Sequence, residues 1–224
     1  MRTGSERASA AGTAVAPARR LSGDGGAIMA EAALITPFFI FMLFGILEFG
    51  GSFRDYLTLN NAVATASRKG SVAANATDAD WQIVSTVRTE IGAMPLSQVQ
   101  RIVIFHASGP TSAVPSACLS GTSGTPGTGS PNWTDACNVY VNTGSATNWR
   151  TVTSSDFGCS VSSPDRYWCP TKRKFAATPG TNGPPDFLGV YIEIKHNFYT
   201  GLFGSDQKMT KTAVIRIEPQ TLGS

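Results

Sequence analysis

The pattern of hydrophobic and polar residues divides the chain into a short polar start, one long apolar run and a mixed remainder. Residues 27–47 form the apolar run, 21 residues in which Glu31 is the only charged side chain. At about 1.5 Å per residue, a helix of this length spans roughly 31 Å, which matches a bilayer hydrocarbon core of about 30 Å. The pattern therefore predicts a transmembrane helix over residues 27–50, followed by a larger domain.

Helical periodicity continues beyond the apolar run. Apolar side chains recur at spacings of three and four up to about residue 72, as in an amphipathic helix. The members of this stripe are Phe49, Phe53, Tyr56, Leu57, Asn60, Val63 and Ala64. A second helical pattern covers residues 80–93, where Asp78 or Asp80 is placed to cap the first turn and Pro95 ends the helix.

Three segments carry strand patterns. Residues 99–107 are rich in Ile, Val and Phe, and their apolar run at 102–105 is typical of a central strand buried on both faces. Residues 190–198 and 211–218 alternate between apolar and polar side chains, with a connection over 200–207. We expect these two strands to pair antiparallel.

The cysteines lie in an irregular insertion over residues 108–186, which is rich in Gly, Ser, Thr, Pro and Asn. A loop of this length is uncommon within a compact domain. An even number of cysteines outside the cytoplasm favours disulfides. We predict pairing between neighbours, although three connectivities are open. The two predicted pairs are Cys118 with Cys137 and Cys159 with Cys169.

The fold class predicted from these patterns is α+β. It has a long N-terminal transmembrane helix that continues into an amphipathic helix, a small antiparallel sheet and a long disulfide-bearing loop region. The domain that follows the anchor covers residues 51–224.

Patterns typical of metal binding and catalysis do not occur in the sequence. No His lies between Cys118 and Cys169, and no Cys-x-x-Cys occurs, so the spacing argues against zinc. His106 and His196 fall in strand patterns without a recognisable catalytic signature. We therefore expect no enzymatic activity, no cofactor and no metal. A short basic cluster is interpreted as solvated surface: Lys172, Arg173 and Lys174.

Charge predicts the orientation in the membrane. The net charge of +3 is too small to indicate nucleic acid binding. Residues 1–26 form a basic leader whose arginines are Arg2, Arg7, Arg19 and Arg20. Since Lys and Arg favour the cytoplasmic side, we expect a cytoplasmic N-terminus and an extracytoplasmic domain. The predicted disulfides agree with that orientation.

Glu31 is the unusual residue of the anchor. A carboxylate in hydrocarbon costs on the order of 2 to 3 kcal/mol, so such a residue is normally functional or paired. A cut between Gly26 and Ala27 would make Glu31 the fifth residue of the product and free an amine about one helical turn away. This arrangement resembles the class III signal of type IV prepilins and pseudopilins.

The fuller string around this acid resembles the TadE-like proteins of the tight-adherence pilus machinery. The resemblance rests on a Glu-x-Ala start, a proline within the helix and a Gly-x-x-Glu-Phe-Gly exit. The residues at these positions are Glu31, Pro37, Gly45, Glu48, Phe49 and Gly50. The resemblance extends from Gly25 to about Gly70.

The resemblance implies a minor pilin-like role in pilus initiation, capping or assembly, or in a related secretion platform. It implies cleavage by a prepilin peptidase between Gly26 and Ala27, and pairing of Glu31 with the amine of a neighbouring subunit. Pro37 and Glu48 are candidates for helix packing and assembly. Glu48 is equally well interpreted as an interfacial acid beside Arg54. The resemblance also implies that the amphipathic stripe packs on the sheet.

A second hypothesis is a membrane-anchored extracytoplasmic binding or adhesion module. Its recognition surface would be residues 108–186, and exposed tryptophans such as Trp133 and Trp149 would then matter. A simple secretion signal is disfavoured, because the apolar run is longer than a signal-peptide core and no small-x-small cleavage site follows it.

Overall fold

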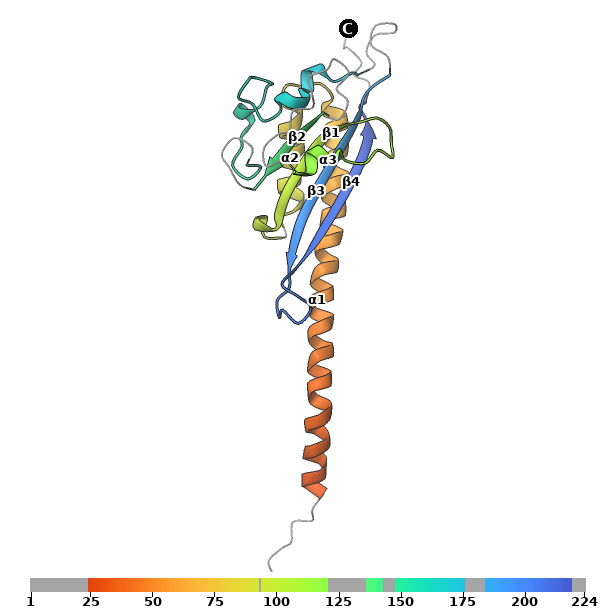
Figure 1. The fold of residues 1–224 in the computed structure, drawn as a ribbon, viewed down its shortest axis with the longest axis vertical. Helices are drawn as coiled ribbons and strands as arrows, with labels where there is room; N and C mark the ends of the chain where they lie inside the picture. Colours follow the sequence, from red (N-terminus) through yellow and green to blue (C-terminus); the bar gives the residue numbers. More distant parts are fainter. Residues whose placement is uncertain (1–23, 93, 121–135, 143–147, 176–183, 219–224) are drawn as a thin grey trace, which may run out of the picture. The chain divides into compact units, whose positions relative to one another are not determined.

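The computed structural model describes residues 24–92, 94–120, 136–142, 148–175 and 184–218. Most of the leader, residues 1–23, therefore lies outside the described residues. The strands form one four-stranded antiparallel sheet in the order β2-β1-β3-β4 (Figure 1). The predicted α+β fold class is confirmed. The helices are α1 (Asp24–Ala73), α2 (Ala79–Glu90) and α3 (Ser116–Ser120), and the strands are β1 (Val99–Ala107), β2 (Cys137–Val141), β3 (Phe187–Asn197) and β4 (Asp206–Arg216).

The chain divides into two units, Met1–Phe44 and Gly45–Ser224. The described part of the first unit is helical, and helix α1 continues past Pro37. Its large apolar side chains are exposed, from 37% at Phe44 to 80% at Leu34. Within the described residues, this apolar helix is the one long and apolar enough to cross a membrane. Exposed apolar side chains over such a length indicate a helix that packs against lipid or against other helices.

The second unit packs α2 and its part of α1 on one face of the sheet, and the short α3 on the other. The central strand β1 is buried on both faces, as its apolar run predicts. Ile102 and Ile104 join the core that contains α1 and α2 side chains. Val103 and Phe105 join a smaller core on the opposite face, which includes Cys118. Residues far apart in sequence thus form two layers on either side of one sheet.

The face of α1 that packs on the sheet differs from the predicted one. Phe49, Phe53, Tyr56 and Leu57 are 40–63% exposed, and Val63 is the member of the predicted stripe that the structure buries. The buried face carries Glu48, Ser52, Asp55, Leu59, Ala62, Val63 and Ala66. The prediction was wrong because the two acids of this face, Glu48 and Asp55, find partners in residues 196–200. A polar side chain can be buried when its hydrogen bonds are satisfied.

Strands β3 and β4 form the antiparallel pair that the alternation predicts, with Ile192 opposite Lys211. Val190, Ile192 and Ile194 face the larger core as expected. Strand β4 begins at Asp206, five residues before the predicted start at 211. The added residues are mostly exposed, so they show no alternation, but they pair with β3 down to Asp206 opposite Asn197.

The insertion over residues 108–186 is not wholly irregular. It contains β2, which pairs antiparallel with β1 and places Cys137 opposite Phe105. All five β2 residues are buried, including the polar Asn138. Because β2 is short and covered on both faces, neither length nor alternation marks it in the sequence.

Both predicted disulfides are confirmed. Cys118 pairs with Cys137 across 19 residues, and Cys159 pairs with Cys169 across 10 residues. A bridge that closes a loop of this size adds about 3 kcal/mol by restricting the unfolded chain. The bridges therefore stabilise the part of the domain with the least regular structure.

Candidate functional site

The carboxylate of Glu48 holds the turn between β3 and β4. Glu48 is fully buried, and its Oε2 accepts a hydrogen bond from the Tyr199 backbone N–H at 2.9 Å. Its Oε1 accepts from the Thr200 backbone N–H at 2.5 Å and from the Thr200 hydroxyl at 2.7 Å. Three donors on one ionised carboxylate form a strong, charge-assisted set of bonds. The exit of the apolar helix is thus tied to a turn about 150 residues later in the chain.

A second buried pair lies two helical turns further along α1. Asp55 Oδ2 is 2.7 Å from His196 Nδ1, and both side chains are at most 3% exposed. Arg54 Nη2 lies 3.4 Å from the other oxygen of Asp55. Arg54 therefore pairs with Asp55 in this structure, and Glu48 is satisfied by the turn. Helix α1 is held to the sheet by acids at two levels.

The outward face of α1 at this level is aromatic. Phe49 and Phe53 are 60% and 63% exposed. A shallow groove of about 570 Å³ runs between this face and the start of β4. Its lining residues are Phe49, Ser52, Phe53, Tyr56, Gln207, Lys208, Met209 and Thr210. This outward aromatic face lies within the second unit and follows directly on the end of the apolar run at residue 47.

A buried polar cluster lies at the start of α2, under the irregular insertion. Asp80 Oδ1 is 2.5 Å from Arg173 Nη2, and both side chains are fully buried. Asp80 Oδ2 accepts from Asn138 Nδ2 at 2.7 Å and from the Tyr140 hydroxyl at 3.0 Å. The Arg173 guanidinium also lies 4.1 Å from the centre of the Trp168 ring. The interpretation of Arg173 as solvated surface was therefore wrong, because its side chain is buried and paired with Asp80. Its neighbours Lys172 and Lys174 are exposed.

Two neighbouring groups have shifted pKa values. Burial, followed by the charge on Asp80, raises the pKa of Tyr140 well above its usual value, so the phenol stays a donor. Burial also raises the pKa of Asp165, although hydrogen bonds from the Gly158 and Cys159 backbone N–H groups oppose this effect. These shifts follow from burial among structural partners. The arrangement orders the disulfide-bearing loops and offers no open position for a substrate at Asp80.

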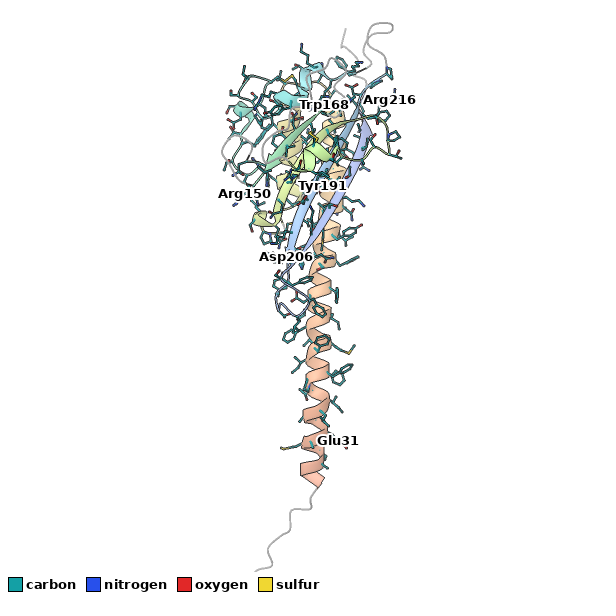
Figure 2. All side chains as sticks on the ribbon, in the orientation of Figure 1. Glu31, Arg150, Trp168, Tyr191, Asp206 and Arg216 are labelled. Carbon is teal, nitrogen blue, oxygen red and sulfur yellow. A yellow bond between two sulfur atoms is a disulfide. The ribbon has the colours of Figure 1, made fainter. Side chains whose placement is uncertain are left out.

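The residues of the predicted processing and packing sites lie on α1. The Gly26–Ala27 bond falls in the first turn of the helix, which begins at Asp24. Glu31, labelled in Figure 2, is exposed. Pro37 is exposed as well. Glu48 belongs to the second unit, whereas Gly26, Ala27, Glu31 and Pro37 belong to the first. The roles of these residues in cleavage and assembly stay predictions.

The binding-module hypothesis loses one of its supports. Trp149 is fully buried in the larger core, so it is not an exposed recognition residue. Arg88 reaches its backbone, because Arg88 Nε donates to the Trp149 carbonyl at 2.6 Å. Trp133 lies outside the described residues. The first of the two histidines, His106, lies near the end of the central strand β1, with its Nε2 3.4 Å from Asp186 Oδ1. The second, His196, pairs with Asp55.

Sequence reasoning missed three residues that organise the domain: Asp80, Asn138 and Arg173. Asp80 had a local interpretation as a helix cap, yet its partners are 58 to 93 residues away. Asn138 offered one signal, a polar residue within the short apolar segment 137–141. A polar residue inside an apolar strand is buried only with partners. Arg173 offered no signal beyond its basic neighbours.

Comparison with known proteins adds one finding. No curated protein and no solved structure matches the chain. A family model matches one segment of the chain, which begins beside the predicted cleavage site and ends five residues before the end of α1. It includes Glu31, Pro37 and the exit motif at residues 45–50. Residues 26–68 match the family described as TadE-like protein, in agreement with the resemblance carried by these residues.

Proposed function

We propose that this chain is a minor pilin-like component of a tight-adherence or type IV pilus, or of a related secretion assembly. It would be anchored by its N-terminal helix and act in initiation, capping or assembly. The observation that carries the proposal is the TadE-like match over residues 26–68, which coincides with the exposed apolar helix. The partners would be the membrane, other pilin-like subunits, the assembly platform and a prepilin peptidase.

The helix surface supports packing against other helices. Apolar side chains are exposed around the described part of the first unit, so any side of it can meet lipid or a neighbouring helix. Glu31 is exposed, and no ion pair to it occurs among the described residues of this chain. A carboxylate at this depth is costly unless it is paired. The amine that cleavage frees on a neighbouring subunit would supply the opposite charge.

The leader supports insertion with a cytoplasmic N-terminus. Its four arginines precede the anchor, and the disulfide-bonded domain follows it. Disulfides persist in oxidising compartments, so the two bridges support a position of residues 51–224 outside the cytoplasm. The Gly26–Ala27 bond lies in the first helical turn, where ends fray easily, so a peptidase needs to open little structure to reach it.

The size of the domain supports a position at the tip or base of a filament. Residues 108–186 add a strand, short helices and two disulfides to the side of the sheet. A folded insertion of this size takes lateral space around the helix. A minor component that sits at an end of a filament needs less lateral packing than a major subunit.

Processing is the experiment that tests this function. We expect the full chain, when expressed with a prepilin peptidase, to give a mature product that starts at Ala27. Gly26→Leu should keep the leader while the helix still inserts, because a side chain at Gly26 meets nothing within 4 Å. The measurement is N-terminal sequencing and intact mass of the membrane-extracted protein.

A matched control separates recognition of the site from damage to the helix. Gly50 also lies in α1 with nothing within 4 Å of an added Cβ, so Gly50→Leu should be processed as the wild type is. A product that starts elsewhere, or an uncut chain in cells that process other prepilins, would remove peptidase processing from the proposed function.

A further inference from the structure

The turn between β3 and β4 presents an apolar, uncharged surface. Residues 198–205 read Phe-Tyr-Thr-Gly-Leu-Phe-Gly-Ser and contain no charged side chain. Tyr199 is 75% exposed and Leu202 is 52% exposed. The charged residues nearest in sequence pair with each other just beside the turn, with Lys195 Nζ 2.9 Å from Asp206. Figure 2 shows Asp206 at this end of β4 and Arg216 at the other end.

The contacts of this turn fix its level along α1. Glu48 binds the backbone of Tyr199 and Thr200, and the ring of Phe203 lies 5.2 Å from the ring of Phe49. A Cβ added at Gly45 would lie 3.7 Å from Phe203 Cζ. The apolar run predicted to span the membrane ends at residue 47. The turn therefore lies beside the residues where the helix leaves the hydrocarbon.

The carboxylate of Glu48 is hidden from the surroundings at this level. Glu48 is fully buried and its carboxylate accepts three hydrogen bonds from the turn. The large exposed apolar or aromatic side chains at this level are Phe49, Phe53, Tyr199 and Leu202, all at least half exposed. The exposed Arg54 lies beside Phe53 and pairs with Asp55. Aromatic residues are enriched at the membrane–water interface, where their rings sit among the lipid headgroups. The surface thus follows directly on exposed Ile46 and Leu47, the last residues of the apolar run, and matches the interface in chemistry.

We propose that the β3–β4 turn is a second membrane contact, in which Tyr199 and Leu202 enter the interfacial layer of the bilayer that the helix spans. The occupant of this surface is lipid. The contact would hold the domain at a fixed height and rotation about its helix, and Glu48 would maintain it by holding the turn. The inference needs the helix to span a membrane, but it does not need pilus assembly, so it can fail or succeed independently of the proposed function.

A fluorescent label placed on the turn tests the contact. Leu202→Cys, carrying a polarity-sensitive fluorophore, is introduced into the full chain and reconstituted in phosphatidylcholine vesicles that contain nitroxide-labelled lipids. The native cysteines are all in disulfides, so the added thiol is the one that reacts. We expect blue-shifted emission and quenching by headgroup or shallow nitroxides several-fold stronger than at a control site. Tyr199→Cys serves as a second labelled position.

The matched control is Val72→Cys. Val72 lies on the same helix and is 52% exposed, as Leu202 is, but it lies 24 residues beyond Glu48. At about 1.5 Å per residue this is roughly 36 Å along the helix, beyond the reach of nitroxides in the bilayer. Labels at 202 and 199 that behave like the label at 72 would overturn the proposal. Blue-shifted but unquenched labels that respond to the protein-to-lipid ratio would also overturn it, because the occupant would then be another protein.

Discussion

Replacement of Asp80 by Ala is expected to destabilise the second unit by about 3 to 5 kcal/mol, the cost of leaving a buried charge without its partner. Arg173 would keep its charge in a site where its side chain is fully buried. Asn138 and Tyr140 would also lose the carboxylate oxygen to which they donate. For a domain of this size we expect Tm to fall by roughly 6 to 20 °C. The measurement is thermal unfolding of the full chain in detergent, followed by near-UV circular dichroism.

Two controls separate the buried ion pair from ordinary surface charge. Asp206→Ala removes a half-exposed partner of Lys195 and should cost about 1 kcal/mol or less. The double variant Asp80→Asn with Arg173→Met removes both charges and keeps an acceptor for Tyr140. It should be clearly more stable than Asp80→Ala. Equal losses for the single and double variants would show that packing, and not charge pairing, holds this cluster together.

Replacement of Glu31 by Gln is expected to abolish assembly while leaving the domain folded. In the proposed function, the carboxylate attracts the freed amine of a neighbouring subunit. Two unit charges about 4 Å apart attract by roughly 4 kcal/mol at an effective dielectric constant of 20. Since about 1.4 kcal/mol is tenfold in an equilibrium constant, association should weaken by tenfold or more. Co-purification with pilin-like subunits and counts of pili per cell measure the effect.

The control for this variant is an exposed acid in the other unit. Glu218→Gln removes the same charge from an exposed side chain far along the sequence from the anchor, and it should leave association unchanged. Thermal unfolding of Glu31→Gln should match the wild type, because Glu31 makes no ion pair among the described residues. Unchanged association and piliation in Glu31→Gln would remove the electrostatic pairing from the account.

The sequence was sufficient for elements whose patterns are long or local. The apolar run at 27–47 predicts the long apolar helix, and the run at 102–105 predicts a strand buried on both faces. Both could be predicted because each is an uninterrupted or nearly uninterrupted run of apolar residues. The β3–β4 pair follows from alternation on both sides of a short connection. The spacing of the cysteines led to the correct disulfide pairs.

The sequence failed where burial depends on partners far along the chain. The periodicity of α1 fits two adjacent stripes, and the more apolar one was expected to pack on the sheet. The structure instead buries Glu48, Ser52 and Asp55. The β3–β4 turn donates hydrogen bonds to Glu48, and His196 pairs with Asp55. Strand β2 and the cluster of Asp80 with Arg173 escaped for the same reason. The ladder of β2 joins residues 32 to 40 apart, and the partners of Asp80 lie 58 or more residues away, so no local pattern contains these contacts.

The role of Glu48 shows how the two kinds of information combine. The family match includes this acid, and the resemblance makes it a candidate for assembly. In the structure both oxygens of its carboxylate accept hydrogen bonds from the β3–β4 turn of the same chain. A contact of Glu48 with another subunit stays a prediction, and it would have to leave these bonds in place or replace them.

The most direct test of the central claim is a photo-cross-link from the apolar helix in cells that assemble pili. A photoreactive residue replaces Leu34, which is 80% exposed, and a control replaces Val161, which is 94% exposed in the second unit. The account predicts an adduct between position 34 and a pilin-like subunit, identified by mass spectrometry, which disappears in Glu31→Gln. A chain that is present in the membrane of piliated cells and gives no such adduct would contradict the account.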